Sequence, residues 1–185
     1  MNPVQVEQEV RRWIEVFVVG EGLCPFAARP LQQGLVRISV CAAKDTDGIY
    51  RHLLCELDHL LNTPVGKLET TVVAVPQGLA SFDDYLDMLA VLQDALAQLQ
   101  LEGVFQLASF HPHYVFEGTN AGDVSNYTNR SPYPLFHLLR EESLSDALEA
   151  YPEPEAIPQR NQERMRELGR EGILRLLTRA SSAQD

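Results

Sequence analysis

Three short apolar runs, separated by long amphipathic stretches, constrain the fold of this chain most. The runs occupy residues 35–41, 70–75 and 104–110, the first two are rich in β-branched residues, and leucine recurs at helical spacing between them. Short β-branched runs are typical of strands, and strands separated by long helices pair in parallel through right-handed crossovers. The sequence therefore predicts an α/β fold with a small, mostly parallel sheet of three to four strands, covered by helices.

Further helices are expected before and after this core. Asn2 and Pro3 are typical of a helix start, because the amide side chain caps a free N–H and proline has none to lose. A polar helix is expected near residues 159–179, after a proline-rich linker. Pro134 is expected to open another helical stretch, which carries Leu135, Leu138 and Leu139.

The length of 185 residues is that of one compact domain. We expect a single α/β domain over residues 1–151, which includes a long loop region at 109–140. Residues 152–185 are expected to form a C-terminal linker and a helical segment that packs on the same domain.

The charge of the chain excludes several classes of partner. Fifteen Lys and Arg against 26 Asp and Glu give a formal net charge of -11. This charge repels phosphate backbones and anionic lipids, so neither a nucleic-acid polymer nor a membrane is an expected partner. No apolar run approaches the about 20 residues of a membrane span, and the three cysteines form no CxxC pair. We expect a cytoplasmic protein with free thiols. No phosphate-binding glycine motif occurs, so no nucleotide cofactor is implied.

The segment at residues 109–140 is the main functional clue. Its formal charge is zero, so the whole net charge lies outside it, and it holds three of the five histidines. It follows the third predicted strand, and open α/β sheets bind ligands beyond the carboxyl ends of their strands. A loop of this length is usually functional or disordered, and its aromatic content argues against disorder. We therefore expect the site here.

The histidines of this segment allow two interpretations. His111 and His113 flank a proline that keeps the chain extended, so both imidazoles project to about the same side, as in metal sites built on one strand. Asp123 and His137 can complete a zinc or iron site with them, and Cys24 can join it if the fold allows. Alternatively, the histidines cap a strand end and bond to the loop that follows.

Arg130 lies in a run crowded with hydrogen-bonding side chains. In one interpretation these side chains organise the loop by bonding to its own backbone. In the other, Arg130 clamps a carboxylate or phosphate through its planar guanidinium, and Arg140 assists it, although a structural ion pair with a glutamate is the favoured role of Arg140. The remaining candidates for substrate contacts are the polar and aromatic residues Asn126, Tyr127, Asn129, Ser131 and Tyr133.

Cys24 lies in a proline-constrained loop, where an accessible thiol becomes a nucleophile only if a histidine stabilises the thiolate. The simpler interpretation is a packed, unreactive cysteine. In the second predicted helix, His52, Glu56 and His59 share a polar side and superficially resemble a ligand set. A solvated helix face explains them better.

Two segments of the chain resemble a bacterial and plant family known as domain of unknown function 1415. They are GLCPFA and SFHPHYVFEGTNAGDVSNYTNRSPYPLFHLLRE, and the resemblance covers the full length. It implies that the candidate residues stand in the signature segments of the family. It implies no activity and no residue roles.

The leading hypothesis is an enzyme that acts on a small anionic metabolite by hydrolysis or group transfer. Arg130 binds the anion, one of His111, His113 or His137 is the general acid or base, and Cys24 is an alternative nucleophile. The second hypothesis is a metal-binding protein that uses His111, His113 and Asp123. The third is a non-catalytic interaction module, which predicts an exposed apolar patch instead of a concave pocket.

Overall fold

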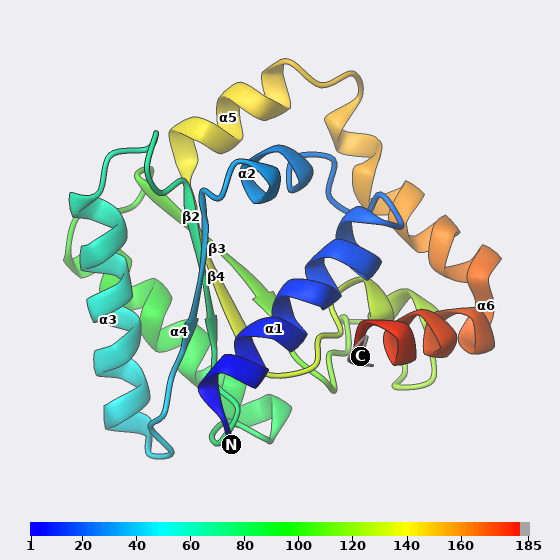
Figure 1. The fold of residues 1–185 in the computed structure, drawn as a ribbon, viewed down its shortest axis with the longest axis horizontal. Coiled ribbons are helices and arrows are strands. Elements are labelled where there is room, and N and C mark those ends of the chain that lie inside the picture. The colour runs from blue at the N-terminus through cyan, green and yellow to red at the C-terminus, as the bar shows by residue number, and fades with distance from the viewer. Residues whose placement is uncertain (182–185) are drawn as a thin grey trace.

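The computed structural model describes residues 1–181 of the chain (Figure 1). A four-stranded sheet is flanked by helices on both faces. In chain order the helical elements are α1 (Pro3–Trp13), η1 (Ile14–Val19), α2 (Ala28–Gln32), α3 (Thr46–Asn62), α4 (Phe82–Gln98), η2 (Val124–Thr128), α5 (Glu141–Glu149), η3 (Pro154–Ala156) and α6 (Ile157–Ser181). The strands are β1 (Val36–Val40), β2 (Thr70–Ala74), β3 (Phe105–Phe110) and β4 (Leu135–Arg140).

The sheet is mixed, with the strand order β1-β2-β4-β3. β1 and β2 pair in parallel, whereas β4 is antiparallel to both β2 and β3. The prediction of a mostly parallel sheet is therefore wrong, although the α/β class and a small sheet of three to four strands are confirmed. The three strands found in the sequence do run in one direction, and β4 inserts between the last two of them.

β4 occupies the residues that were expected to begin a helix, and that prediction is wrong. Phe136 and Leu138 face one hydrophobic cluster, while Leu135 faces the other. A central strand buried on both faces shows a nearly continuous apolar run instead of a clean alternation. The run LFHLL therefore resembled a short helical stripe, and only the pairing partners on either side identify it as a strand.

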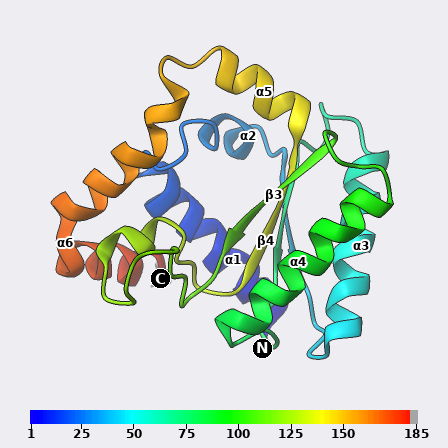
Figure 2. The same cartoon turned by 180° about the vertical axis from the view of Figure 1, so that it is seen from behind.

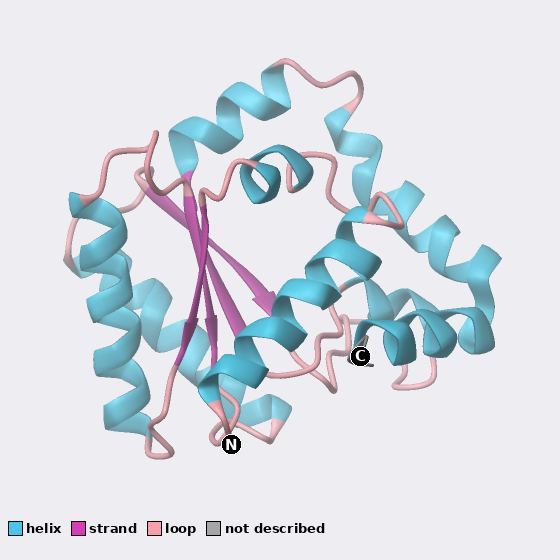
Figure 3. Ribbon diagram, viewed as in Figure 1, coloured by secondary structure: helices cyan, strands magenta, loops and turns pink. Residues whose placement is uncertain are grey.

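Helices cover both faces of the sheet (Figure 3), and each face has its own hydrophobic cluster. On one face α3 and α4 pack on the sheet through residues that include Leu53, Leu57 and Tyr85. On the other face α1 and α6 pack around Trp13 and Phe17. Burial of a large apolar side chain contributes about 1.5–3 kcal/mol, so these contacts are what hold the helices in place.

The C-terminal helix returns to the first one. α6 contains one non-helical residue, Gly169, with φ 60° and ψ 170°, and bends there. Its two halves place Met165 and Ile173 in the cluster that α1 forms. The second half lies beside the loop between β3 and β4 (Figure 2). Among the residues described, no helix is long and apolar enough to cross a membrane.

Candidate functional site

A cavity of about 290 Å³ lies beside the loop between β3 and β4, just beyond the carboxyl end of β3. α1, the loop and the end of α6 surround it. This position agrees with the rule that ligands of open α/β sheets bind outside the carboxyl ends of the strands. The cavity is lined by Glu9, Trp13, Pro112, His113, Tyr127, Arg130, Ser131, Pro132, Leu177, Ala180 and Ser181.

The amide side chains of the loop hold the loop itself together. Asn126 is fully buried, and its Oδ1 accepts hydrogen bonds from the Phe116 N–H and the Thr119 hydroxyl, both at 2.9 Å. Asn129 donates through its Nδ2 to the carbonyl of Ser109 at 3.0 Å. Every polar group satisfied in this way is unavailable to a substrate, so the loop-organising interpretation holds for both asparagines.

Asp123 begins the short helix η2. Its Oδ1 accepts hydrogen bonds from the backbone N–H of Ser125 at 2.9 Å and from the Ser125 hydroxyl at 2.8 Å. These two bonds lower the pKa of Asp123. The carboxylate is thus a helix cap, which is the commonest use of aspartate at this position.

His111 is fully buried, and both of its ring nitrogens are engaged. Nε2 lies 3.0 Å from the carbonyl oxygen of Leu79, and Nδ1 accepts a hydrogen bond from the His113 N–H at 3.0 Å. A carbonyl only accepts, so the proton is on Nε2 and the ring is neutral. Burial lowers the pKa of His111, which favours the same state. His111 therefore supports the loop and does not contact the cavity.

His137 is also part of the framework. It lies within β4, and its Nε2 is 2.7 Å from the Thr70 hydroxyl, which itself donates to the carbonyl of Leu138. The hydroxyl proton is used, so the His137 Nε2–H must be the donor to Thr70. Burial lowers the pKa of His137 to about 4, so the ring is neutral near pH 7.

His113 is the one candidate histidine that lines the cavity. The side chain is exposed, and within the described part of the chain its ring nitrogens form no hydrogen bond. Its ring centroid lies 5.8 Å from that of His111. Of the three histidines considered, His113 alone lines the cavity with both ring nitrogens free of hydrogen bonds to the described residues.

Arg130 both builds the loop and lines the cavity. Its Nε donates to the carbonyl of Tyr114 at 3.1 Å, and its Nη2 donates to the carbonyl of Ala121 at 2.8 Å. The guanidinium carbon lies 4.6 Å from the ring centroid of Tyr127, a cation–π contact. These partners are neutral, so the full positive charge of Arg130 remains, and part of its five-donor fork is unused.

The opposite wall of the cavity carries a carboxylate. Glu9 of α1 accepts a hydrogen bond of 2.5 Å from the Tyr133 hydroxyl. Burial, together with the adjacent Glu9, raises the pKa of Tyr133 to about 12, so this phenol stays protonated. Trp13, one turn further along α1, is 3% exposed, and its indole N–H has no acceptor among the residues described.

Ser131 and Tyr127 also line the cavity. The Ser131 hydroxyl donates to the carbonyl of Tyr133 at 2.5 Å and is thereby committed to the loop backbone. Tyr127 is 9% exposed and packs in the core beneath the Arg130 guanidinium. Sequence reasoning named both of them, but it missed Glu9 and Trp13, because nothing in the sequence relates the first helix to a loop more than 100 residues away.

Arg140 lies at the end of the sheet opposite to the cavity, where β4 ends. It donates to the carbonyls at the end of α3, with Nη2 at 2.6 Å from Leu60 O and 2.5 Å from Thr63 O, and it also reaches Leu68 O. The expected ion pair with a glutamate is wrong, and so is its grouping with Arg130. A cation is well placed here because the C-terminal carbonyls of a helix carry partial negative charge.

Cys24 is half-buried in the loop before α2, and burial raises the pKa of its thiol above the ordinary value. The thiol is therefore protonated at neutral pH and is not activated. Throughout residues 1–181 no three His, Cys, Asp or Glu side chains gather where they can hold a metal ion. The candidate metal ligands His111, His113 and Asp123 are thus not assembled into such a group.

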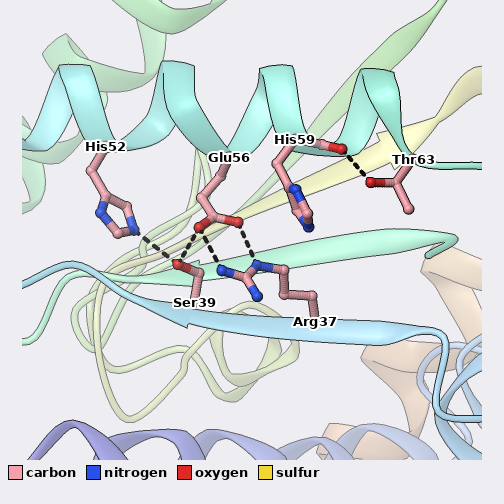
Figure 4. A network of polar contacts seen from close by, with 6 residues as sticks. All are labelled: Arg37, Ser39, His52, Glu56, His59 and Thr63. Atoms are coloured by element: carbon pink, nitrogen blue, oxygen red, sulfur yellow. Dashed lines mark hydrogen bonds and ion pairs between the residues drawn. The ribbon is translucent and has the colours of Figure 1, made fainter. Parts of the chain in front are cut away.

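A second polar network, between β1 and α3, was not anticipated (Figure 4). Arg37 donates to both oxygens of Glu56, at 2.7 and 3.0 Å, and the Ser39 hydroxyl donates to Glu56 at 2.7 Å. Glu56 is only 7% exposed, so the expectation of a solvated helix face is wrong for it. Burial alone raises the pKa of Glu56, but the hydrogen bonds and positive charge around it outweigh this effect and lower it.

The same network contains a serine next to a histidine, at 2.9 Å between Ser39 Oγ and His52 Nε2. An ionised Glu56 accepts only, so the hydroxyl proton of Ser39 is directed to Glu56 and Ser39 must accept from the His52 Nε2–H. His52 is thus oriented as a donor and cannot remove the proton of Ser39. The network is a cross-link between strand and helix, not a nucleophile.

A family model described as a protein of unknown function (DUF1415) matches residues 5–175, and the chain belongs to this family. The match confirms the family resemblance of the two sequence segments. No curated protein and no solved structure compared with the chain matches it.

Proposed function

We propose that this protein is an enzyme that binds a small organic anion in the cavity between α1 and the 111–134 loop, with Arg130 as the anion-binding residue and His113 as the general acid or base. The observation that carries the proposal is the shared cavity: a cationic side chain and a free imidazole line the same space of about 290 Å³. A space of this size suits a small metabolite rather than a polymer.

The electrostatics of the cavity favour an anionic group on the ligand. The net charge of the protein is -11, so an anion is repelled by most of the surface. Arg130 keeps its charge because its protein partners are neutral carbonyls and an aromatic ring. A carboxylate or phosphate placed against it forms charge-assisted hydrogen bonds, which are about twice as strong as neutral ones.

The role of His113 follows from exclusion of the other histidines. His111 and His137 have their Nε2–H groups committed to the framework, whereas the ring of His113 is exposed in the cavity. An imidazole changes charge near neutral pH and serves as acid or base without strong tuning. The reaction class that fits is proton-assisted hydrolysis or group transfer on the bound anion.

The experiment uses Trp13, which is the single tryptophan of the chain and lines the cavity. Its fluorescence is recorded while the full-length protein is titrated with small carboxylates and phosphate monoesters, each paired with a neutral amide or alcohol of the same skeleton. We expect a saturable change with anions and none with the neutral partners. Equal responses to acid and amide would show that the anion-binding part is wrong.

Two variants complete the design. Arg130→Gln removes the cation and is expected to weaken anion binding at least about tenfold, the worth of one charge-assisted contact. Arg166→Gln removes an exposed arginine of α6 and serves as the matched control. For any ligand that binds, conversion is followed by NMR, and His113→Gln is expected to keep the affinity while losing turnover.

A further inference from the structure

Two side chains of opposite charge line the cavity, and within residues 1–181 they pair neither with each other nor with a third charged group. Glu9 and Arg130 both line it, and among the described residues neither one takes part in an ion pair. Buried or half-buried charges are ordinarily paired, because an isolated charge loses its hydration without compensation. Two unpaired charges of opposite sign in one small cavity therefore suggest a ligand that supplies both partners.

The carboxylate of Glu9 is held in place by two hydrogen bonds from uncharged donors. Its Oε2 accepts from the Tyr133 hydroxyl at 2.5 Å and its Oε1 accepts from Gln5 Nε2 at 2.9 Å. Both donors are neutral, since the pKa of Tyr133 is raised to about 12 and a glutamine amide does not titrate. The hydrogen bonds fix the carboxylate in place without neutralising it, which leaves it able to attract a cation.

The rest of the lining is apolar or offers a hydrogen-bond donor. Trp13, Pro112, Pro132 and Leu177 contribute hydrocarbon surface. Trp13 is only 3% exposed, yet its indole N–H has no acceptor among residues 1–181. An unsatisfied buried donor costs about 1–3 kcal/mol, and an acceptor on a ligand removes that cost.

We propose that the ligand of this cavity is a small zwitterion of the amino-acid type, with its carboxylate at Arg130, its ammonium at Glu9 and an apolar side chain against Trp13 and Leu177. This inference rests on the proposed function and narrows its substrate class from organic anions to ammonium carboxylates. It also explains why an anion-binding cavity has a carboxylate in its wall: Glu9 binds the ammonium group of the ligand.

The test measures Trp13 fluorescence in the full-length protein with L-alanine, L-valine, L-leucine and L-phenylalanine. Each is compared with its deaminated acid and its decarboxylated amine, which for leucine are 4-methylpentanoate and 3-methylbutylamine. We expect at least one amino acid to bind about tenfold or more tightly than both of its analogues, because each analogue lacks one charge-assisted contact.

The variants assign the ammonium to Glu9. Glu9→Gln keeps an oxygen that can accept from Tyr133 and removes the charge. We expect it to weaken amino-acid binding at least about tenfold and to leave binding of the deaminated acid unchanged or stronger. Glu7→Gln removes a carboxylate from the same helix, where Glu7 pairs with Arg11 outside the cavity lining, and is expected to change neither affinity.

The outcomes separate this inference from the proposed function. If the deaminated acids bind as tightly as the amino acids, the zwitterion is wrong while the anion site stands. If Glu9→Gln weakens the binding of amino acids and of deaminated acids equally, Glu9 maintains the shape of the cavity and does not bind the ammonium group. If none of the amino acids binds but other organic anions do, the substrate class is wrong. If no anion and no amino acid changes the fluorescence, both proposals fall.

Discussion

The buried imidazole of His111 holds the backbone of His113, with 3.0 Å between its Nδ1 and the His113 nitrogen. The other ring nitrogen, Nε2, is tied at 3.0 Å to the carbonyl of Leu79, a residue in the left-handed backbone region at φ 55°. One histidine thus connects the loop after β2 to the segment that presents the other histidine to the cavity. The two histidines of the HPH segment therefore have different roles: His111 supports the loop, and His113 presents its side chain to the cavity.

This division predicts the result of replacing each one by alanine. His111→Ala removes two buried hydrogen bonds and leaves a cavity, so we expect the free energy of unfolding to fall by about 2–4 kcal/mol. His113→Ala keeps the backbone N–H and removes an exposed side chain, so we expect a change within about 0.5 kcal/mol. Urea unfolding followed by circular dichroism measures both. Similar losses for the two variants would contradict the division.

His137 predicts a loss of stability in mild acid. Burial lowers its folded-state pKa to about 4, below the ordinary value of 6.5, so the unfolded chain binds a proton more readily. Its contribution to stability is therefore complete above about pH 6.5 and is lost as the pH falls toward 4. The loss from this residue amounts to at most about 3 kcal/mol.

The measurement is urea unfolding at several pH values between 7 and 4. His137→Gln is expected to show a flatter pH dependence than the wild type, because it has no ionisable group at this place in β4. His59→Gln replaces an exposed histidine of α3 and is expected to retain the wild-type dependence. If the free energy of unfolding of the His137→Gln variant falls with pH as steeply as that of the wild type and of His59→Gln, His137 is not the source of the acid sensitivity.

The pair of Arg37 and Glu56 predicts a large effect on the α3 side of the sheet. Glu56 is 7% exposed and receives three hydrogen bonds from Arg37 and Ser39. Glu56→Ala leaves these donors without an acceptor, and because Arg37 is 45% exposed and can turn to water, we expect a loss of about 1–3 kcal/mol. Its lowered pKa means that this stability is lost as the pH falls through the folded-state value.

Asp58→Ala, an exposed position two residues along the same helix, is the matched control and is expected to change the free energy of unfolding by no more than about 0.5 kcal/mol. The two variants are compared at pH 7 in the same denaturant titration. A loss at Glu56 no larger than that at Asp58 would mean that the network is incidental to stability.

Sequence reasoning could place the helices and the three strands that share one direction, because their periodicities are local properties. It could not place β4, since a strand with both faces buried lacks the alternation that distinguishes it from a short helix. It placed a long loop after the third strand, where the structure has the loop between β3 and β4 and the cavity beside it. The roles of individual histidines depended on ring partners such as Leu79 and Thr70, which are distant in sequence.

The cavity itself was the least predictable feature. Its carboxylate wall comes from α1, and the contact between Glu9 and Tyr133 spans 124 positions. Glu9 looks like any polar residue on the outer side of an amphipathic helix, and the single tryptophan looks like a core residue. The side chains of this cavity are brought together by tertiary packing, so no local sequence pattern predicts that they share a site.

Arg140 provides the sharpest contrast with Arg130. Both are arginines of the neutral 109–140 segment, yet Arg140 binds the final carbonyls of α3 at the opposite end of the sheet. Arg140→Met removes these charge-assisted bonds, so we expect a loss of about 1.5–3 kcal/mol in unfolding free energy. We expect no change in the affinity for anions that Trp13 fluorescence reports, because the residue does not line that cavity. Arg130→Gln is expected to weaken that affinity, and a variant of Arg140 that did the same in folded protein would reassign the anion site.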